Sequence, residues 1–102
     1  GNTLQLLDLL ETNDEDVAER LEFEENARKI YQYLETVLTK RERDIIRMRY
    51  GLPTHHRSQE RTEITQREIA KKYGISRSYV SRIEKRALEK LREAYENDKS
   101  KT

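Results

Sequence analysis

The chain contains no cysteine, no tryptophan, one proline and only three glycines among its 102 residues. Without cysteine it can form neither a disulfide scaffold nor a cysteine-ligated zinc site, and it has no cysteine nucleophile. Leucine, isoleucine, valine and phenylalanine together number 22. This composition excludes a large buried core and lies close to the composition of disordered chains.

Long apolar segments are also missing. No run approaches the roughly 20 apolar residues of a membrane-spanning helix, and the N-terminus lacks the basic and apolar regions of a signal peptide. The composition therefore predicts a soluble, intracellular, helical protein without a membrane partner. Because the sequence begins with Gly1 rather than methionine, we expect it to be a piece of a longer protein.

Charged residues make up 40% of the chain, and their two signs are segregated. Residues 1–38 carry ten acids and three bases, whereas residues 39–102 carry ten acids and eighteen bases. The resulting charges are −7 and +8. A basic region of this kind is typical of nucleic-acid binding, although a highly charged, solvated helical surface explains it equally well.

Apolar residues at spacings of three and four predict four helices, over residues 15–37, 40–50, 65–73 and 77–95. The first carries seven of the ten acids of residues 1–38, so we expect it to pack on the Ile45 face of the second helix, away from nucleic acid. Residues 52–64 are polar and lack periodicity, which predicts a loop. The leucine-rich residues 4–10 leave two alternatives open, packing back on the domain or docking on a partner.

These elements predict an all-α fold, a small helical domain with a C-terminal helix-turn-helix. The expected organisation is a linker end at 1–14, the helical domain at 15–95 with the helix-turn-helix at 65–95, and a frayed tail at 96–102.

Helix boundaries are marked by local chemistry. Thr39 and Glu42, and likewise Thr65 and Glu68, have the spacing of a capping box, in which each side chain bonds the other residue's backbone N–H. Gly51 is suited to end the second helix because glycine tolerates a left-handed conformation.

Residues 65–95 have the pattern of a helix-turn-helix, two capped helices joined by a short glycine turn. Ala70 is small enough for a close helix crossing, Gly74 permits positive φ, Ile75 plugs the corner, and Ser76 caps the second helix. The second helix then presents polar groups on the face opposite its apolar stripe: Arg77, Ser78, Ser81, Arg82 and Lys85. Arginine and serine in such positions contact base edges and phosphates, but two ordinary helices joined by a glycine turn would share the pattern.

Three segments resemble region 4 of sigma-70-type transcription initiation factors. They are residues 38–52 (LTKRERDIIRMRYGL), 65–70 (TQREIA) and 74–92 (GISRSYVSRIEKRALEKLR). Within that family they are most similar to the sporulation factors sigma-K and sigma-E. The resemblance covers about residues 15–95, and residues 1–14 resemble more loosely the end of the linker called region 3.2.

The resemblance implies binding to the promoter −35 element and docking on the β flap of bacterial RNA polymerase, in the bacterial cytoplasm at the nucleoid. The implied base contacts are Arg77, Ser78, Ser81 and Arg82. The implied contacts to the DNA backbone are Arg41, Arg49, Thr65, Gln66, Arg86 and Arg92, to which the helix pattern itself adds Ser76 and Lys85. The stretch between Gly51 and Thr65 is longer than in housekeeping relatives. Ser78 and Ser81 replace larger side chains there, which favours a different −35 sequence.

Other functions find less support in the sequence. The adjacent His55 and His56 lack a third ligand nearby, so we predict an exposed loop pair and no metal. The acids have no accompanying nucleophile, phosphate loop or metal signature, so we predict neither an enzyme nor a cofactor. Two alternatives remain: a protein-interaction module that binds an anti-sigma factor or an activator without binding DNA, and a LuxR-type output domain. Residues 79–87 argue against the LuxR-type domain.

Overall fold

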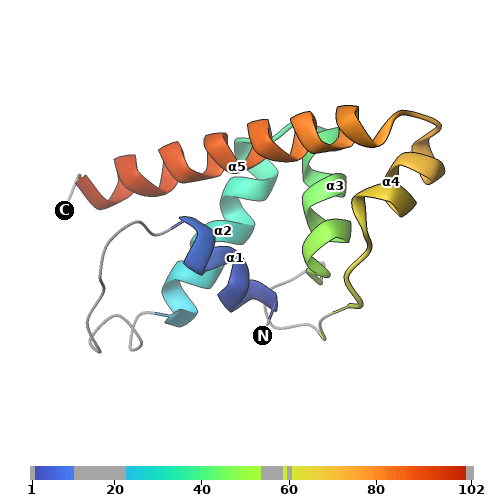
Figure 1. Ribbon diagram of the computed structural model, residues 1–102. Coiled ribbons are helices and arrows are strands. Elements are labelled where there is room, and N and C mark those ends of the chain that lie inside the picture. The colour runs from blue at the N-terminus through green and yellow to red at the C-terminus, as the bar shows by residue number, and fades with distance from the viewer. Residues whose placement is uncertain (1, 11–22, 54–58, 60, 101–102) are drawn as a thin grey trace.

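The computed structural model of the chain describes residues 2–10, 23–53, 59 and 61–100 (Figure 1). Over these residues it is all-α and contains no strand, as predicted. Its helices are α1 (Asn2–Leu10), α2 (Phe23–Thr36), α3 (Lys40–Tyr50), α4 (Gln66–Tyr73) and α5 (Arg77–Ser100). The 24-residue α5 is about 36 Å long at 1.5 Å per residue, and it packs against each of the other four helices.

The ends of α3 follow the predicted chemistry, whereas the capping box predicted at Thr65 forms only in part. Thr39 and Glu42 form a complete capping box, with Glu42 N donating to Thr39 Oγ1 at 3.2 Å and Thr39 N donating to Glu42 Oε1 at 3.0 Å. Gly51 ends α3 in the left-handed region at φ 62°. Thr65 caps α4 by accepting from Glu68 N at 3.1 Å, while its hydroxyl donates to the Glu68 carboxylate.

The larger of two apolar clusters joins α1, α2, α3 and the C-terminal half of α5. We call it the large core. Its buried members are Leu6, Leu7, Leu10, Ile30, Tyr31, Leu34, Leu38, Ile46, Leu52, Ala87, Leu91 and Tyr95. The large core holds the four helices together, because the apolar stripe of each helix alone would be exposed to water.

The smaller cluster, the small core, joins α3 to the helix-turn-helix. Its buried members are Ile45, Ile69, Ala70 and Val80. Ile45 and its neighbour Ile46 enter different cores because successive residues on a helix point in different directions. The expectation that the acidic helix packs on the Ile45 face is therefore wrong: α2 packs chiefly against α1 and α5, and Ile46 is the α3 residue that joins it in the large core.

The segment at 4–10 lies in α1, which packs back on the domain. Leu6, Leu7 and Leu10 are buried in the large core. Hydrogen bonds hold both ends of the helix: Asn2 Nδ2 donates to the carbonyls of Gly51 and Arg61, and Arg92 Nη2 donates to the Leu9 carbonyl at 2.9 Å. The described part of the expected linker is thus built into the domain.

Two further boundaries differ from the sequence expectation. Of the helix expected at 15–37, α2 accounts for Phe23–Thr36, and residues 15–22 lie outside the described residues. The tail expected to fray from residue 96 continues as helix to Ser100. Asp98 accepts a hydrogen bond from the Tyr33 hydroxyl at 2.7 Å and pairs with Lys29 at 3.4 Å. These contacts to α2 stabilise the last turns.

Candidate nucleic-acid interface

The helix-turn-helix is formed by α4, the turn at residues 74–76 and the first half of α5. Gly74 takes φ 68°, and its N–H caps the end of α4 by bonding the carbonyls of Ala70 and Lys71. Ile75 N donates to the Ala70 carbonyl at 3.0 Å, and the Ile75 side chain packs partly buried on the small core. The turn therefore has the predicted geometry, with the glycine at its only left-handed position.

The start of α5 is capped as predicted. Ser76 Oγ accepts a hydrogen bond from Tyr79 N at 3.1 Å, and the Ser76 carbonyl accepts from Val80 N. The capping serine and the first three residues of the helix are exposed. The positive end of the helix dipole is thus accessible to an anionic group.

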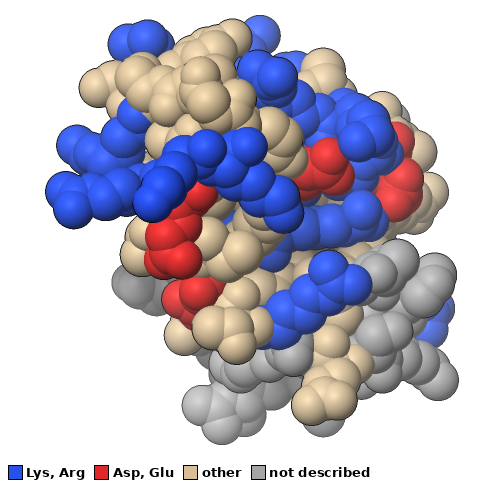
Figure 2. Space-filling model, turned by 90° about the vertical axis from the view of Figure 1, so that its right-hand side faces the viewer, with Lys and Arg blue, Asp and Glu red and all other residues tan. Residues whose placement is uncertain are grey.

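One side of α5 is buried and the other is exposed over the first three turns. Val80, Glu84 and Ala87 are buried, with Ile83 half-buried beside them. The predicted polar face is exposed along its whole length and comprises Arg77, Ser78, Ser81, Arg82 and Lys85. Figure 2 shows lysine and arginine side chains gathered on this end of the molecule, with fewer acidic side chains between them.

Two arginines of this region stack on aromatic rings. The guanidinium of Arg82 lies 5.9 Å from the ring centroid of Tyr79, and that of Arg41 lies 5.6 Å from the centroid of Tyr73. Such contacts orient a cation while leaving its N–H donors open. The sequence analysis did not single out Tyr79, which is 42% exposed.

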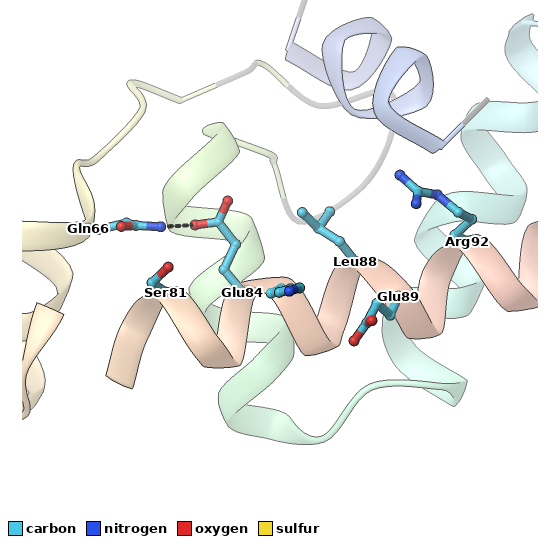
Figure 3. Close-up of a pocket in the computed structure, with 7 residues that line it drawn as sticks. Gln66, Ser81, Glu84, Leu88, Glu89 and Arg92 are labelled. Atoms are coloured by element: carbon cyan, nitrogen blue, oxygen red, sulfur yellow. Dashed lines mark hydrogen bonds between the residues drawn. The ribbon is translucent and has the colours of Figure 1, made fainter. Parts of the chain in front are cut away.

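The other predicted DNA-contacting residues divide between two sides of α5. Gln66, Ser81, Lys85 and Arg92 line a shared groove of about 290 Å³ together with Glu84, Leu88 and Glu89 (Figure 3). On the other side of α5, Arg86 lies one turn before Lys90. Lys90 Nζ donates to Glu42 Oε1 at 2.9 Å, at the start of α3. Arg41 belongs to that same end of α3. Thr65 and Ser76 are exposed caps, at the starts of α4 and α5.

Besides the two caps, the predicted DNA contacts Arg49, Gln66 and Arg92 already have intramolecular partners. Arg49 lies 3.5 Å from Glu84, Gln66 donates to Glu84 at 2.8 Å, and Arg92 donates to the Leu9 carbonyl. Arg49 and Gln66 are half-buried, so they have less freedom to reach a ligand than exposed residues such as Lys85. The structure brings Gln66 and Arg77 together through a 3.3 Å hydrogen bond.

Glu84 is the residue that the sequence analysis missed. It is 9% exposed and accepts hydrogen bonds from Gln66 and from the Tyr50 hydroxyl. Burial, followed by the Glu84 charge and hydrogen bond, raises the pKa of Tyr50 to about 12. A signal was present in the spacing, because position 84 lies four residues after Val80 and three before Ala87, within the buried stripe.

The described residues contain neither a metal-binding cluster nor a membrane-spanning helix. No group of three or more histidine, aspartate and glutamate side chains there has an arrangement that could hold a metal ion. His55 and His56 lie outside the described residues. Among the described helices, none is long and apolar enough to cross a membrane.

The two helices, their glycine turn and the exposed arginines and serines define a helix-turn-helix DNA-binding domain. The family model "Sigma-70, region 4" matches residues 36–93, which is more than half of the chain. The chain therefore belongs to the sigma-70 region 4 family, as the sequence resemblance suggested.

Curated relatives carry the similarity beyond the matched region. The chain is 45% identical over 102 residues to the RNA polymerase sigma-K factor of Bacillus subtilis, covering 99% of this chain and 32% of that protein. It is 46% identical over 91 residues to the sigma-28 factor of Bacillus thuringiensis subsp. kurstaki, covering 89% and 35%. It is 38% identical over 92 residues to the sigma-E factor of Clostridium acetobutylicum, covering 90% and 36%. The chain thus spans about a third of these relatives, and no solved structure matches it significantly.

Proposed function

We propose that this chain is the C-terminal domain of a sigma initiation factor, which binds the promoter −35 element and docks on the β flap of bacterial RNA polymerase. It acts in the bacterial cytoplasm at the nucleoid and carries no enzymatic activity. The observation that carries this proposal is the exposed face of α5, where arginine and serine side chains stand opposite the small core.

Base recognition is assigned to four residues of that face: Arg77, Ser78, Ser81 and Arg82. Side chains in the first turns of a recognition helix reach base edges in the major groove. Arginine forms two hydrogen bonds to guanine, and serine accommodates several bases. The two small serines leave room between the two arginines for a base pair to approach the helix closely.

Contacts to the DNA backbone are assigned to the surrounding residues, which fix the position of the domain without selecting sequence. They are Arg41, Arg49, Thr65, Gln66, Ser76, Lys85, Arg86 and Arg92. Among the described residues, Arg41, Lys85 and Arg86 form no salt bridge, so their charge is available to phosphate.

Docking on the polymerase is assigned to the half of the domain that lies away from the helix-turn-helix. In Figure 1, α3 stands between α2 and α4, so α1 and α2 lie apart from the helix-turn-helix. This separation leaves the surface of α1 and α2 available for a protein partner while the start of α5 lies on DNA.

The test is a titration of the chain against a random DNA pool, with and without the polymerase β flap. We expect selection of a single −35-like sequence, with weak affinity that falls as salt rises, by about 0.9 in log K against log salt for each phosphate neutralised. Affinity independent of salt would contradict the electrostatic assignment. Binding to the flap without any DNA selection would instead favour the protein-interaction module.

A further inference from the structure

A chain of hydrogen bonds connects the start of the recognition helix to a buried carboxylate. Arg77 Nη1 donates to Gln66 Oε1 at 3.3 Å, and Gln66 Nε2 donates to Glu84 Oε1 at 2.8 Å. The other Glu84 oxygen accepts from the Tyr50 hydroxyl at 3.1 Å, and Arg49 Nε lies 3.5 Å from Oε1. Figure 3 shows the Gln66 amide and the Glu84 carboxylate pointing toward one another.

The order of donors and acceptors in this chain leaves one orientation for Gln66. A carboxylate only accepts hydrogen bonds, whereas an amide has one donating and one accepting end. Glu84 therefore holds the NH₂ group of Gln66, and the Gln66 oxygen is left to face Arg77. The reversed amide would place its oxygen against the carboxylate and its NH₂ group against a guanidinium, and both contacts are repulsive.

The location of Glu84 makes this arrangement stiff. Its side chain is 11% exposed, and its partners come from α3 and α4 while it belongs to α5. The network therefore connects three helices through one buried carboxylate. Arg77 is exposed, so without the Gln66 oxygen nothing described in its surroundings restricts its guanidinium.

We propose that Glu84 is a positioning residue for DNA recognition, which orients Arg77 toward its base through the amide of Gln66. The proposal rests on the proposed function, because it assigns a task to a residue beneath the base-contacting face. Glu84 itself does not touch DNA. It restricts Arg77 before binding, so that less conformational freedom is lost when the arginine meets its base.

Glu42 offers a matched control. It is 8% exposed, against 9% for Glu84, and it too has a cationic partner, Lys90, from which it accepts a hydrogen bond at 2.9 Å. Burial opposes its ionisation, but the hydrogen bonds from Lys90 and from the Thr39 backbone lower its pKa overall. Its described partners do not include a residue of the base-contacting face, so Glu42→Gln perturbs a buried carboxylate without touching the Gln66 amide.

The experiment measures base preference for the 102-residue chain and its variants, using the −35-like sequence selected from the random pool and its single-base changes. Arg77→Ala first identifies the base pair that depends on Arg77. We expect Glu84→Gln to lower discrimination at that base pair roughly three- to tenfold, a part of what a bidentate arginine supplies. Affinity for nonspecific DNA does not fall, because Arg77 keeps its charge and Arg49 loses its acidic partner. Glu42→Gln leaves discrimination unchanged.

A rescue variant separates orientation from stability. In the double variant Glu84→Gln with Gln66→Glu, residue 84 donates to a carboxylate at residue 66, and that carboxylate accepts from Arg77. We expect discrimination at the Arg77 base pair to return. Should Glu84→Gln fail to fold, Gln66→Leu interrupts the same chain at a half-buried position. Because Gln66 is also assigned a contact to the DNA backbone, we expect discrimination at the Arg77 base pair to fall by a larger factor than affinity for nonspecific DNA.

The outcomes distinguish this inference from the proposed function. If the unaltered chain selects no sequence, the proposed function fails and this inference fails with it. If the unaltered chain selects a sequence and Glu84→Gln keeps full discrimination at the Arg77 base pair, this inference alone is wrong. An equal loss of affinity for every sequence would show that Glu84 is only structural, and would also overturn it.

Discussion

The two halves of α5 pack in different ways. Among the described residues, twelve buried side chains form the large core around its C-terminal half, whereas four form the small core beneath its N-terminal half. A helix that exposes one face to DNA can bury only a narrow stripe on the other. The N-terminal half of α5 with the helix-turn-helix, which we call the recognition end, therefore depends more on polar contacts. Glu84 accepts two hydrogen bonds there.

The two regions also differ in whether their arginines and lysines have acidic partners. Near the large core the cations are paired: Arg43 and Arg47 donate to Glu35 at 2.7 and 2.8 Å, and Lys90 binds Glu42. At the recognition end, Arg82 has an aromatic neighbour but, among the described residues, no acidic partner. Positive charge is thus neutralised where the helices pack, as it also is for Arg49 beside Glu84, and left open on the exposed face of α5 where DNA is expected.

The first prediction, which has the largest expected effect, concerns substitutions in the two cores. Leu91 is completely buried in the large core, and Leu91→Ala should lower the free energy of unfolding by about 2–5 kcal/mol. Val80→Ala in the small core removes less apolar volume and should cost about 1–3 kcal/mol. Urea unfolding followed by circular dichroism measures both. Equal losses would mean that the small core stabilises the fold as much as the large one.

The second prediction compares the glycines that end α3 and α4. Both have positive φ, 62° at Gly51 and 68° at Gly74, and alanine in that region costs about 1–2 kcal/mol. A methyl group at Gly51 would also collide with the Arg61 carbonyl and approach Asn2 Nδ2, while at Gly74 it would meet nothing within 4 Å. Gly51→Ala should therefore destabilise the chain to urea by more than Gly74→Ala.

A matching cost for the two glycine variants would contradict the packing described around α1. Asn2 donates to the Gly51 and Arg61 carbonyls, so the Gly51 variant disturbs the N-terminal end of α1 as well as the end of α3. The Gly74 variant disturbs only the turn.

Features that depend on local chemistry could be predicted from the sequence. The capping box at Thr39, the left-handed glycines and the Ser76 cap involve residues within five positions of one another, and all three were confirmed. The α3 and α4 boundaries followed from them. The exposure of the recognition face also followed, because helix periodicity places Ser81 and Arg82 opposite Ala87.

Features that depend on distant partners could not be predicted. Residues 4–10 fitted two alternatives because a leucine-rich segment does not identify what buries it. The partners of Glu84 lie 18 and 34 positions away, so an acid within an apolar stripe gave no indication of its bonding. Ile45 and Ile46 are equally apolar, and only their tertiary neighbours assign each to its core, α1, α2 and α5 for Ile46 and the helix-turn-helix for Ile45. The DNA contacts themselves stay predictions.

The third prediction concerns Arg82 and Arg86, one turn apart on α5. Arg82→Ala should cost about 1–3 kcal/mol of binding free energy and relax preference at one or two base pairs. Arg86→Ala should weaken binding to all sequences about equally and lower the salt slope by about one. Both side chains are exposed, so neither change should alter stability by more than about 0.5 kcal/mol.

A competition assay over single-base variants of the selected site tests this pair, with urea unfolding as the control for folding. Full base preference in Arg82→Ala would show that Arg82 contacts no base. Loss of base preference in Arg86→Ala would instead assign a base contact to the side of α5 that faces the start of α3.

The smallest expected effect compares the two tyrosines that bind acids of α5, Tyr50 at the recognition end and Tyr33 at the other. Tyr50 donates to Glu84 at 3.1 Å and Tyr33 to Asp98 at 2.7 Å. Burial first, and then the acidic partner, raises the pKa of Tyr50 to about 12 and that of Tyr33 further still. At neutral pH each hydroxyl is protonated, and Tyr50→Phe should cost about 1 kcal/mol of stability.

Raising the pH should remove this contribution. An unfolded tyrosine ionises near pH 10, whereas Tyr50 in the folded chain keeps its proton until about pH 12. The stabilisation by Tyr50 is therefore complete below pH 10 and is lost as pH rises from about 10 to 12.

Urea unfolding at pH 8 and pH 11.5 tests this loss. The difference in free energy of unfolding between the unaltered chain and Tyr50→Phe should be smaller at pH 11.5. For Tyr33→Phe the loss continues to higher pH, so its difference in free energy of unfolding should shrink at least as much over this interval and go on shrinking above it. If the stability difference for Tyr50→Phe instead grows with pH, Glu84 does not accept a hydrogen bond from the Tyr50 hydroxyl in solution. Tyr50 would then not connect the polar network of the recognition end to α3.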